Sequence, residues 1–331
     1  MNFYLEALQD EHQLLLKALP GYRGAVERVG ARIRALFAAG KARRLLLAGM
    51  GSSWYAARSA APALNGKGCF TVAMNCFELL TQTPGMVDAH TVLVLITQSG
   101  NTPEAVRLAE YARGRAALTV AVLNEEQCAM RGLTDEELLL DMGRETRISN
   151  KTYYAQVALL NLLAAAVTEG DLDAVEREIR RAVDWHEEYR SAQEKRTGPL
   201  LDIFRRSALI EALGDGPQGG AAQQAGLVLR EMPLLQVACY SASDYSHGWF
   251  DIARPGYTAV FFCDWITALD ERMMRHCLDA GAQVVLLAAE KAPLQHENLL
   301  EVPLPDQKGG LLPLYSIVPM YFAAGLLPER R

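Results

Sequence analysis

Apolar runs of strand length alternate with helical patterns along most of this chain. In the first half, strands are predicted at residues 43–50, 70–74, 91–98, 117–124 and 138–142, with helical patterns between them, as at 54–64 and 104–113. Strands that are separated by helices in this way pair in parallel, and the helices cover both faces of the sheet. The pattern therefore predicts an α/β fold.

The same alternation starts again in the second half. A helical span at 153–167 comes first, followed by a charged helical segment at 172–196 that is predicted to connect two domains. Strands are then predicted at 207–214, 235–239, 258–264, 283–290 and 298–303, before an apolar helix at 314–326. Each half opens with a strand that ends in glycines, at 48–53 and 212–220, which indicates a duplicated unit.

These patterns divide the chain into four parts. We expect an N-terminal helical segment at residues 1–28, a first α/β unit at 29–170, a helical connector at 171–198 and a second unit at 199–331. In open parallel sheets, ligands bind beyond the carboxyl ends of the strands. The glycine-rich strand ends are therefore the first places to look for a site.

Composition and charge narrow the classes of function. Half of the 331 residues are apolar and 22% are charged, which is typical of a packed globular protein. The net charge of −6 gives no general attraction to nucleic acid or to an anionic membrane, so neither is expected as a partner. The N-terminus lacks a signal-peptide pattern, and no apolar run is expected to reach membrane-spanning length.

The cysteines and most histidines show no ligand pattern. The six cysteines are scattered without a CxxC pair, which favours reduced structural thiols and a cytoplasmic location over a disulfide or zinc framework. The histidines other than His247 lack the HxxxH and HExxH spacings of metal sites. We therefore expect no metal and no other cofactor.

The most informative segment is the loop ITQSGNTPE at residues 96–104. It joins a predicted buried strand to a predicted helix, with Pro103 suited to the first helical turn. The first amides of a helix lack partners and the helix dipole favours an anion there, but each such contact contributes only about 0.3–1 kcal/mol. Several hydroxyl groups must therefore converge. Because the loop has no Lys, it is not a nucleotide-hydrolysing P-loop, and the predicted ligand is a phosphorylated small molecule.

A second glycine-rich turn, GMGSS at residues 49–53, ends the first predicted strand. Its glycines allow close approach of the backbone, and Ser52 and Ser53 can either cap the next helix or bind an anion. The turn does not complete a dinucleotide fingerprint, since Trp54 occupies the last position. If the two strands are neighbours, this turn and the 96–104 loop share one rim of the sheet.

A third polar segment, ETRISNKTY at residues 145–153, precedes the long helix. Its side chains can cap that helix, or they can contact the sugar hydroxyls or the phosphate. In this order the three segments resemble the motifs of the sugar isomerase (SIS) family: G-[TS]-S, then [ST]-Q-S-G-x-T, then E-x(2–4)-S-x-K. The resemblance implies two tandem flavodoxin-like, three-layer α/β/α units with parallel sheets.

The resemblance also implies a set of substrate-binding residues. Ser149 is expected to bind the sugar, and the other motif residues are expected to form the phosphate-binding site. The full set is Gly51, Ser52, Ser53, Thr97, Gln98, Ser99, Thr102, Ser149 and Lys151.

Two candidate catalytic residues follow from the same resemblance. In the amidotransferase and deglycase branches, a helix of the second unit ends in a catalytic Glu, and a catalytic His follows in an H-G-[PW] loop; Glu231 and His247 stand at those positions. Glu231 is expected to move a proton between C1 and C2 of an open-chain sugar, and His247 to assist ring opening. Each such acid–base group typically accelerates the reaction by about 10²–10⁴-fold. In the family the His comes from the partner subunit, which implies a homodimer with composite sites.

Some positions depart from the amidotransferase branch. Val228 replaces a Lys of the catalytic helix, and neither a Lys-bearing tail after the final PERR nor a glutamine-hydrolysing domain before the first unit is expected. These departures favour a deglycase or an aldose–ketose isomerase that acts on a 6-phosphorylated ketosamine or amino sugar. Tyr240 and Asp244 either contact the substrate or shape the loop.

The alternative to an enzyme is a non-catalytic phosphosugar-binding sensor. Such sensors usually carry a DNA-binding domain, and the N-terminal segment has no basic patch for DNA.

Overall fold

The computed structural model describes residues 3–145 and 148–328, and the chain divides into two compact units. Asp10–Val183 form the unit called here the N-terminal unit; Met1–Gln9 and Asp184–Arg331 form the C-terminal unit. Thr146, Arg147 and the last three residues of the chain, which entered the sequence interpretation, lie outside the described residues.

The limits of the units differ from the expected ones because helices run through them. Helix α1 (Phe3–Ala38) continues past residue 28, where a separate N-terminal segment was expected to end. The expected connector consists of α6 (Leu172–Ser191) and the first part of α7 (Gln193–Arg206), and the division between the units falls inside α6. A continuous helix leaves no loop at which a sequence pattern could mark a domain boundary.

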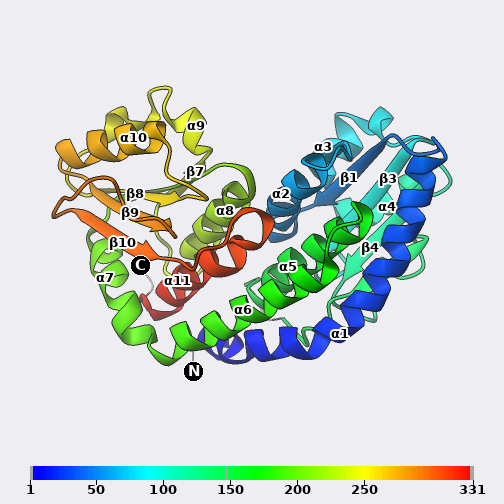
Figure 1. The fold of residues 1–331 in the computed structure, drawn as a ribbon, viewed down its shortest axis with the longest axis horizontal. Coiled ribbons are helices and arrows are strands. Elements are labelled where there is room, and N and C mark those ends of the chain that lie inside the picture. Colours follow the sequence, from blue (N-terminus) through cyan, green and yellow to red (C-terminus); the bar gives the residue numbers. More distant parts are fainter. Residues whose placement is uncertain (1–2, 146–147, 329–331) are drawn as a thin grey trace. The chain divides into compact units, whose positions relative to one another are not determined.

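Five parallel strands form the sheet of the N-terminal unit, in the order β2-β1-β3-β4-β5 (Figure 1). The residues of the three inner strands, β1, β3 and β4, are almost all buried, which explains why these strands show continuous apolar runs rather than alternation. This order is that of flavodoxin-like sheets, in which the ligand lies where the strand order reverses, between β1 and β3. The strands are β1 (Arg44–Gly49), β2 (Thr71–Asn75), β3 (Thr91–Thr97), β4 (Leu118–Leu123) and β5 (Glu136–Leu139).

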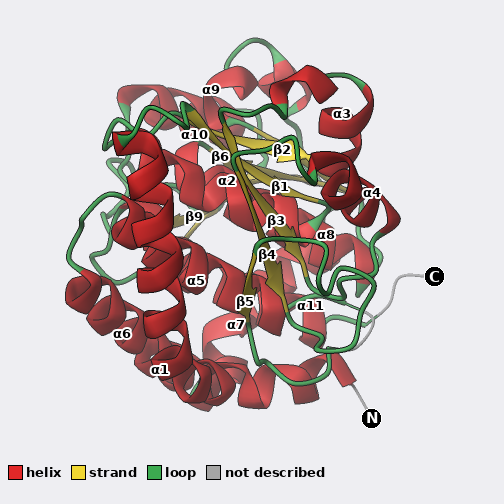
Figure 2. Cartoon of the chain, turned by 90° about the vertical axis from the view of Figure 1, so that its right-hand side faces the viewer, coloured by secondary structure: helices red, strands yellow, loops and turns green. Residues whose placement is uncertain are grey.

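Helices cover both faces of this sheet (Figure 2). Helices α3 (Cys76–Thr81) and α4 (Pro103–Ala112) pack on one face, against alternate residues of the central strands such as Leu46 and Leu93. Helices α2 (Ser52–Asn65) and α5 (Lys151–Val167) pack against each other, and α2 also contacts β1 and β3. Every residue of α5 is buried, which accounts for its apolar sequence.

The C-terminal unit repeats this topology. Its five parallel strands have the order β10-β9-β8-β6-β7, which is the same flavodoxin-like order when it is counted from β7. The strands are β6 (Leu209–Gly214), β7 (Val237–Tyr240), β8 (Tyr257–Phe262), β9 (Gln283–Ala288) and β10 (Leu299–Pro303). The predicted α/β fold with parallel sheets is therefore confirmed.

Helices α8 (Gly216–Glu231) and α11 (Pro313–Leu326) pack against each other in this unit, and α8 contacts the sheet. Helix α10 (Ala268–Asp279) packs with the apolar core of the other face. The short helix α9 (Ala242–Tyr245) follows β7. Single 3₁₀ turns occupy Pro84–Met86, Trp249–Ile252 and Gly309–Leu311.

The turn after the first strand is the same in both units. A Cβ at Gly49 would come within 2.7 Å of the Ser53 backbone, and a Cβ at Gly214 would come within 2.6 Å of the Gln218 carbonyl oxygen. Gly51 and Gly216 both have φ of 52°, which favours glycine. The chain needs these glycines to turn from a strand directly into a helix, and their shared geometry supports the predicted duplication.

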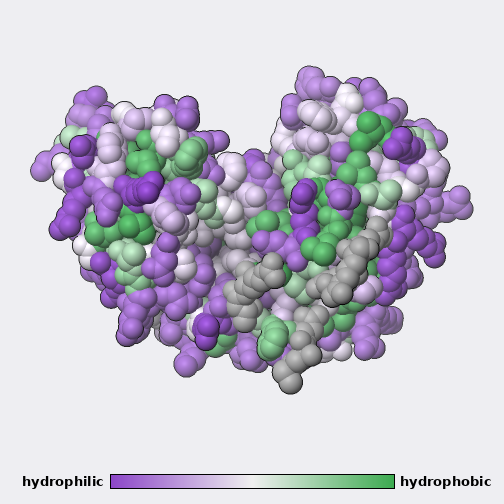
Figure 3. Space-filling model, turned by 180° about the vertical axis from the view of Figure 1, so that it is seen from behind, coloured by the Kyte–Doolittle hydropathy of each residue, from purple (hydrophilic) through white to green (hydrophobic). Residues whose placement is uncertain are grey.

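One sequence expectation on apolar runs is wrong. Residues Gly309–Leu326 are long and apolar enough to cross a membrane by length and composition. In the structure 83% of this window is buried, and α11 packs against α7 and α8 within the C-terminal unit. Burial of the helix inside a unit thus explains its composition. Hydrophilic residues cover most of the face of the molecule in Figure 3.

Candidate functional site

A small cavity lies at the carboxyl ends of β1 and β3, at the point where the strand order of the N-terminal sheet reverses. Its volume is about 150 Å³. The polar residues that line it are all among those predicted to bind substrate: Ser52, Ser53, Thr97, Gln98, Ser99, Thr102 and Ser149. Met50, Ile96 and Ala105 complete the lining and were not predicted, because an apolar side chain carries no signal of a polar ligand.

Two hydroxyl groups of the 96–104 loop are held in one orientation. The Thr97 hydroxyl oxygen accepts from the amide of Gly100 at 3.2 Å, and the Ser99 hydroxyl oxygen accepts from the amide of Asn101 at 3.1 Å. A hydroxyl that already accepts has its own hydrogen left to donate. The Thr97 oxygen also lies 3.3 Å from the Thr102 oxygen. The loop therefore presents donors, which suits a ligand rich in acceptor oxygens.

Two helices begin at this cavity. Helix α2 starts at Ser52, directly after Gly51, and α4 starts at Pro103, directly after Thr102. The first amides of each helix have no partner within the helix, and the dipole is positive at that end. None of the described lining residues is Lys or Arg. Attraction for an anion therefore comes from dipoles and oriented hydroxyls.

The third motif builds the start of α5. The Glu145 carboxylate accepts from the amides of Asn150, Lys151 and Thr152, each at 3.1 Å, and also from the Thr152 hydroxyl. Burial raises the pKa of Glu145, and the hydrogen bonds oppose that rise. The Ser149 hydroxyl lies 3.4 Å from the carboxylate. Glu145 thus fixes the helix start that carries Ser149 to the cavity.

Lys151 is not among the residues that line the cavity. Its ammonium group donates to the carbonyl oxygen of Arg144 at 2.8 Å, and the residue is only 8% exposed. In this arrangement the Lys151 side chain fastens the segment before α5, and the ligand-binding role expected from the motif has no geometric support. Gly51 contributes its backbone turn.

Glu231 and His247 lie on opposite edges of the C-terminal sheet. Helix α8 starts at the carboxyl end of β6 and runs back along the sheet, so its last residue, Glu231, lies toward the amino ends of the strands. Its 16 residues span about 24 Å. His247 follows β7 and α9, so it lies at the carboxyl edge. Both residues are exposed, and within this unit the fold separates them.

The loop that carries His247 is anchored by aromatic residues. The rings of Tyr240 and Trp249 stack with centroids 4.7 Å apart, which gives Tyr240 a part in shaping the loop. Tyr245, two residues before His247, is fully buried, and its hydroxyl group contacts that of Tyr257, which donates to the Glu211 carboxylate at 2.5 Å. The loop therefore has a defined conformation although His247 is exposed.

The equivalent edge of the C-terminal sheet carries carboxylates where the N-terminal sheet carries hydroxyls. Asp215 stands in the turn after β6, and its carboxylate accepts from the amide and hydroxyl of Ser243. Asp264 follows β8. These charges repel a phosphate. The corresponding edges of the two units thus differ in charge.

The Asp264 carboxyl group makes stability depend on pH. Burial raises its pKa from 3.8 to about 6, against the opposing effects of the Gly309 amide and Lys308. The folded state then binds more protons than the unfolded state between those values, so this group lowers the free energy of unfolding as pH rises from about 4 to about 6, by about 2 kcal/mol after screening.

Asp264→Asn should therefore match the wild-type protein in urea unfolding at pH 4 and exceed it by about 2 kcal/mol at pH 7.5. The exposed Asp251→Asn serves as the control and should show no such pH-dependent difference. Equal gains for Asp264→Asn at both pH values would contradict the assignment.

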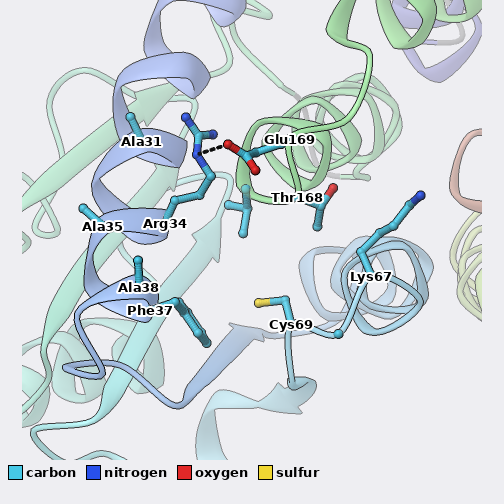
Figure 4. Close-up of a pocket in the computed structure, with 11 residues that line it drawn as sticks. Ala31, Arg34, Ala35, Phe37, Ala38, Lys67, Cys69, Thr168 and Glu169 are labelled. Atoms are coloured by element: carbon cyan, nitrogen blue, oxygen red, sulfur yellow. Dashed lines mark ion pairs between the residues drawn. The ribbon is translucent and has the colours of Figure 1, made fainter.

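A larger hollow, of about 550 Å³, lies at the opposite, amino edge of the N-terminal sheet (Figure 4). The last turns of α1, the end of α5 with the residues after it, and the segment that follows α2 form its walls. Arg34 points toward Glu169, at 3.9 Å, and donates to the Ala166 carbonyl oxygen, while Lys67 points away from the hollow. The carbonyl groups at the ends of helices favour cations, so the basic side chains here are explained by the fold and do not indicate a ligand. The hollow has no converging hydroxyl groups.

No group of three or more His, Cys, Asp or Glu residues that could hold a metal ion occurs in ranges 3–145 and 148–328. All six cysteines are free thiols. The site is thus built from the hydroxyl, amide and backbone groups of one sheet edge.

Together, the doubly wound sheet, its glycine-turned strand ends and the cavity lined by hydroxyl groups define an α/β protein with a polar cavity at its switch point. Residues 40–166 match the family model described as the SIS domain. The match lies within the N-terminal unit and confirms, for that unit, the predicted resemblance to the SIS family.

The relatives and solved structures agree with this assignment. The chain is 26% identical to a glutamine–fructose-6-phosphate aminotransferase of Aeropyrum pernix. The alignment of 334 positions covers 97% of this chain and 53% of that protein. It is 25% identical over 227 residues to a fructosamine deglycase of Bacillus subtilis, covering 64% of this chain and 66% of that protein. The chain spans about half the length of the aminotransferases that it matches.

Its fold is similar to the C-terminal domain of glucosamine-fructose-6-phosphate aminotransferase from Francisella tularensis. The TM-score is 0.78 at 16% identity, over 96% of this chain and 94% of that domain. The tandem arrangement of two flavodoxin-like units is therefore an architecture that already occurs in a solved structure.

Proposed function

We propose that this chain is an enzyme that processes a sugar phosphate, a deglycase or an aldose–ketose isomerase acting on a 6-phosphorylated ketosamine or amino sugar. The observation that carries this proposal is the cavity at the switch point of the N-terminal sheet. Seven polar residues converge there between two helix starts, and at least two of the hydroxyl groups are oriented as donors. A phosphate has three acceptor oxygens to receive such donors.

In this proposal each polar group at the cavity has a part. Ser53, Thr97, Gln98, Ser99 and Thr102 hold the phosphate, and Ser149 contacts the sugar. The names of the relatives, which include a fructosamine deglycase and glutamine–fructose-6-phosphate aminotransferases, favour amino-sugar phosphates. A cytoplasmic homodimer would make this chemistry available to soluble metabolites.

The proposed chemistry is proton transfer in an open-chain sugar. Glu231 removes a proton from one of the two carbons C1 and C2 and returns it to the other, while a second proton passes between the oxygen or nitrogen on C1 and the oxygen on C2, so that the double bond moves between the two carbons. His247 assists ring opening by proton transfer at the ring oxygen. In a deglycase, water then hydrolyses the C1 imine and the amine leaves. The proton that Glu231 removes remains on the carboxyl group between the two transfers, so it can exchange with solvent. Val228 is fully buried, and a Lys at that position would place an ammonium group in the apolar interior.

Ser99→Ala should weaken binding of the sugar phosphate by about tenfold or more, because a hydrogen bond to a charged group contributes about 1.5–3 kcal/mol. Isothermal titration calorimetry measures the change. Ser59→Ala, also in the N-terminal unit and buried on α2 with its hydroxyl bonded to the Tyr55 carbonyl, is the matched control and should bind like wild type. Unchanged affinity of Ser99→Ala would remove the phosphate assignment of this loop.

The reaction is tested by solvent exchange. The protein is incubated in D₂O with 6-phosphorylated ketoses, amino sugars and fructosamines, and NMR follows deuterium at C1 and C2. Label at either carbon supports proton-transfer chemistry and identifies the substrate class. Binding of a sugar phosphate without any label would instead favour the non-catalytic sensor.

A further inference from the structure

A buried glutamine on α5 contacts the cavity from behind. Gln156 has no exposed surface, and its side-chain amide nitrogen donates to the Ser53 hydroxyl oxygen at 3.0 Å. Ser53 lines the cavity and lies on α2, which packs against α5. Among the described residues, the Gln156 side-chain oxygen has no hydrogen-bond partner.

This contact is costly for the fold. A buried amide with only one of its groups satisfied is less favourable than an apolar side chain of the same size. The rest of α5 around Gln156 is buried and mainly apolar. Stability alone therefore does not account for a glutamine here, and its one hydrogen bond ends on a residue of the cavity.

The direction of the hydrogen bond determines what Ser53 can do. A serine hydroxyl has one hydrogen to donate and two lone pairs, and Gln156 occupies one lone pair of Ser53, which favours donation of the Ser53 hydrogen to the cavity. Thr97 and Ser99 are oriented in the same way by backbone amides. At Ser53 the donor comes from a side chain, and a substitution can remove it.

The C-terminal unit keeps a polar contact at the corresponding place with the roles exchanged. Gln218 lies on α8, four residues after Gly214, just as Ser53 lies on α2, four residues after Gly49. The Ser316 hydroxyl of α11 donates to the Gln218 side-chain oxygen at 2.8 Å. In that unit the hydroxyl is on the rear helix and the edge is acidic.

We infer that Gln156 is a positioning residue that orients the Ser53 hydroxyl as a hydrogen-bond donor, so that this subsite favours the acceptor oxygens of a phosphate dianion. This inference rests on the proposed function, since it concerns how the same cavity selects its phosphate. Gln156 does not touch the ligand and acts through Ser53.

The test is a double-mutant cycle on Ser53 and Gln156, with binding of inorganic phosphate at pH 8 followed by ³¹P NMR titration. Gln156→Met, which has similar size and no hydrogen bond, should weaken binding about tenfold in the wild-type background and have no effect in the Ser53→Ala background. Gln156→Glu, whose carboxylate accepts the Ser53 hydrogen and repels the anion, should weaken binding further. Gln156→Met should melt at or above the wild-type temperature.

The outcomes separate this inference from the proposed function. Wild-type affinity of Gln156→Met overturns the inference and leaves the phosphate site intact. Equal losses in both backgrounds also overturn it, because Gln156 would then not act through Ser53. If the wild-type protein binds neither inorganic phosphate nor any sugar phosphate, the proposed function fails and the inference fails with it. Asn161→Leu, which removes another buried amide of α5, is the control and should bind like wild type.

Discussion

Replacement of Glu231 by Gln should leave sugar-phosphate binding unchanged and lower turnover by about 10²–10⁴-fold. The amide keeps the size of the side chain and its position at the end of α8, but it cannot accept and return a proton. Deuterium should therefore fail to appear at C1 or C2 of the substrate in D₂O. The measurement is the rate of label incorporation by NMR, beside the dissociation constant from calorimetry.

The control for this prediction is Glu271→Gln. Glu271 lies on α10 of the same unit, where its carboxylate pairs with Arg275 at 2.7 Å on the surface. Its loss changes the net charge equally and should leave turnover at the wild-type rate. Wild-type exchange in Glu231→Gln would rule out the proton-transfer role. Loss of binding together with turnover would assign Glu231 to substrate binding.

Features that depend on neighbouring residues could be predicted from the sequence. Strand β3, the loop after it and helix α4 are continuous in the chain, so an apolar run followed by hydroxyl residues and Pro103 was enough to predict a strand, an anion loop and a helix start. The same holds for the turn from β1 into α2. Parallel pairing then brings these two loops together, because β1 and β3 are neighbours.

Features that depend on distant contacts could not be predicted in this way. Lys151 stands at a motif position, yet its ammonium group donates to the Arg144 carbonyl oxygen, a contact that the spacing of the motif does not reveal. Gln156 was missed because it lies within an apolar helix; the signal was a single amide among buried residues. The short helix α3 was missed, since its six residues carry no clear period.

The two units differ at the sheet edge where the phosphate site is proposed. Both keep the glycine pair that turns the first strand into a helix. At the carboxyl edge, however, the cavity of the N-terminal unit is lined by hydroxyl groups, and none of its described lining residues is Lys or Arg. The corresponding edge of the C-terminal unit has the carboxylates of Asp215 and Asp264. In the proposed function, the C-terminal unit supplies Glu231 and His247.

Mixing two inactive variants should restore activity. Glu231 and His247 lie at opposite edges of one sheet, so a site that needs both is expected to draw them from two chains of a homodimer. When Glu231→Gln and His247→Gln chains are unfolded together and refolded, half of the dimers should be mixed. Each mixed dimer of twofold symmetry has one site with both residues intact, so about a quarter of wild-type turnover should return.

Each variant refolded alone is the control and should stay about 10²–10⁴-fold below wild type. The same exchange assay in D₂O measures all three samples, and sedimentation confirms that the mixed sample is dimeric. If the mixture remains as inactive as its components while dimers form, both residues act from one chain, and the composite site is wrong. Recovery near a quarter cannot arise from either variant by itself, because each lacks one of the two acid–base groups in every site.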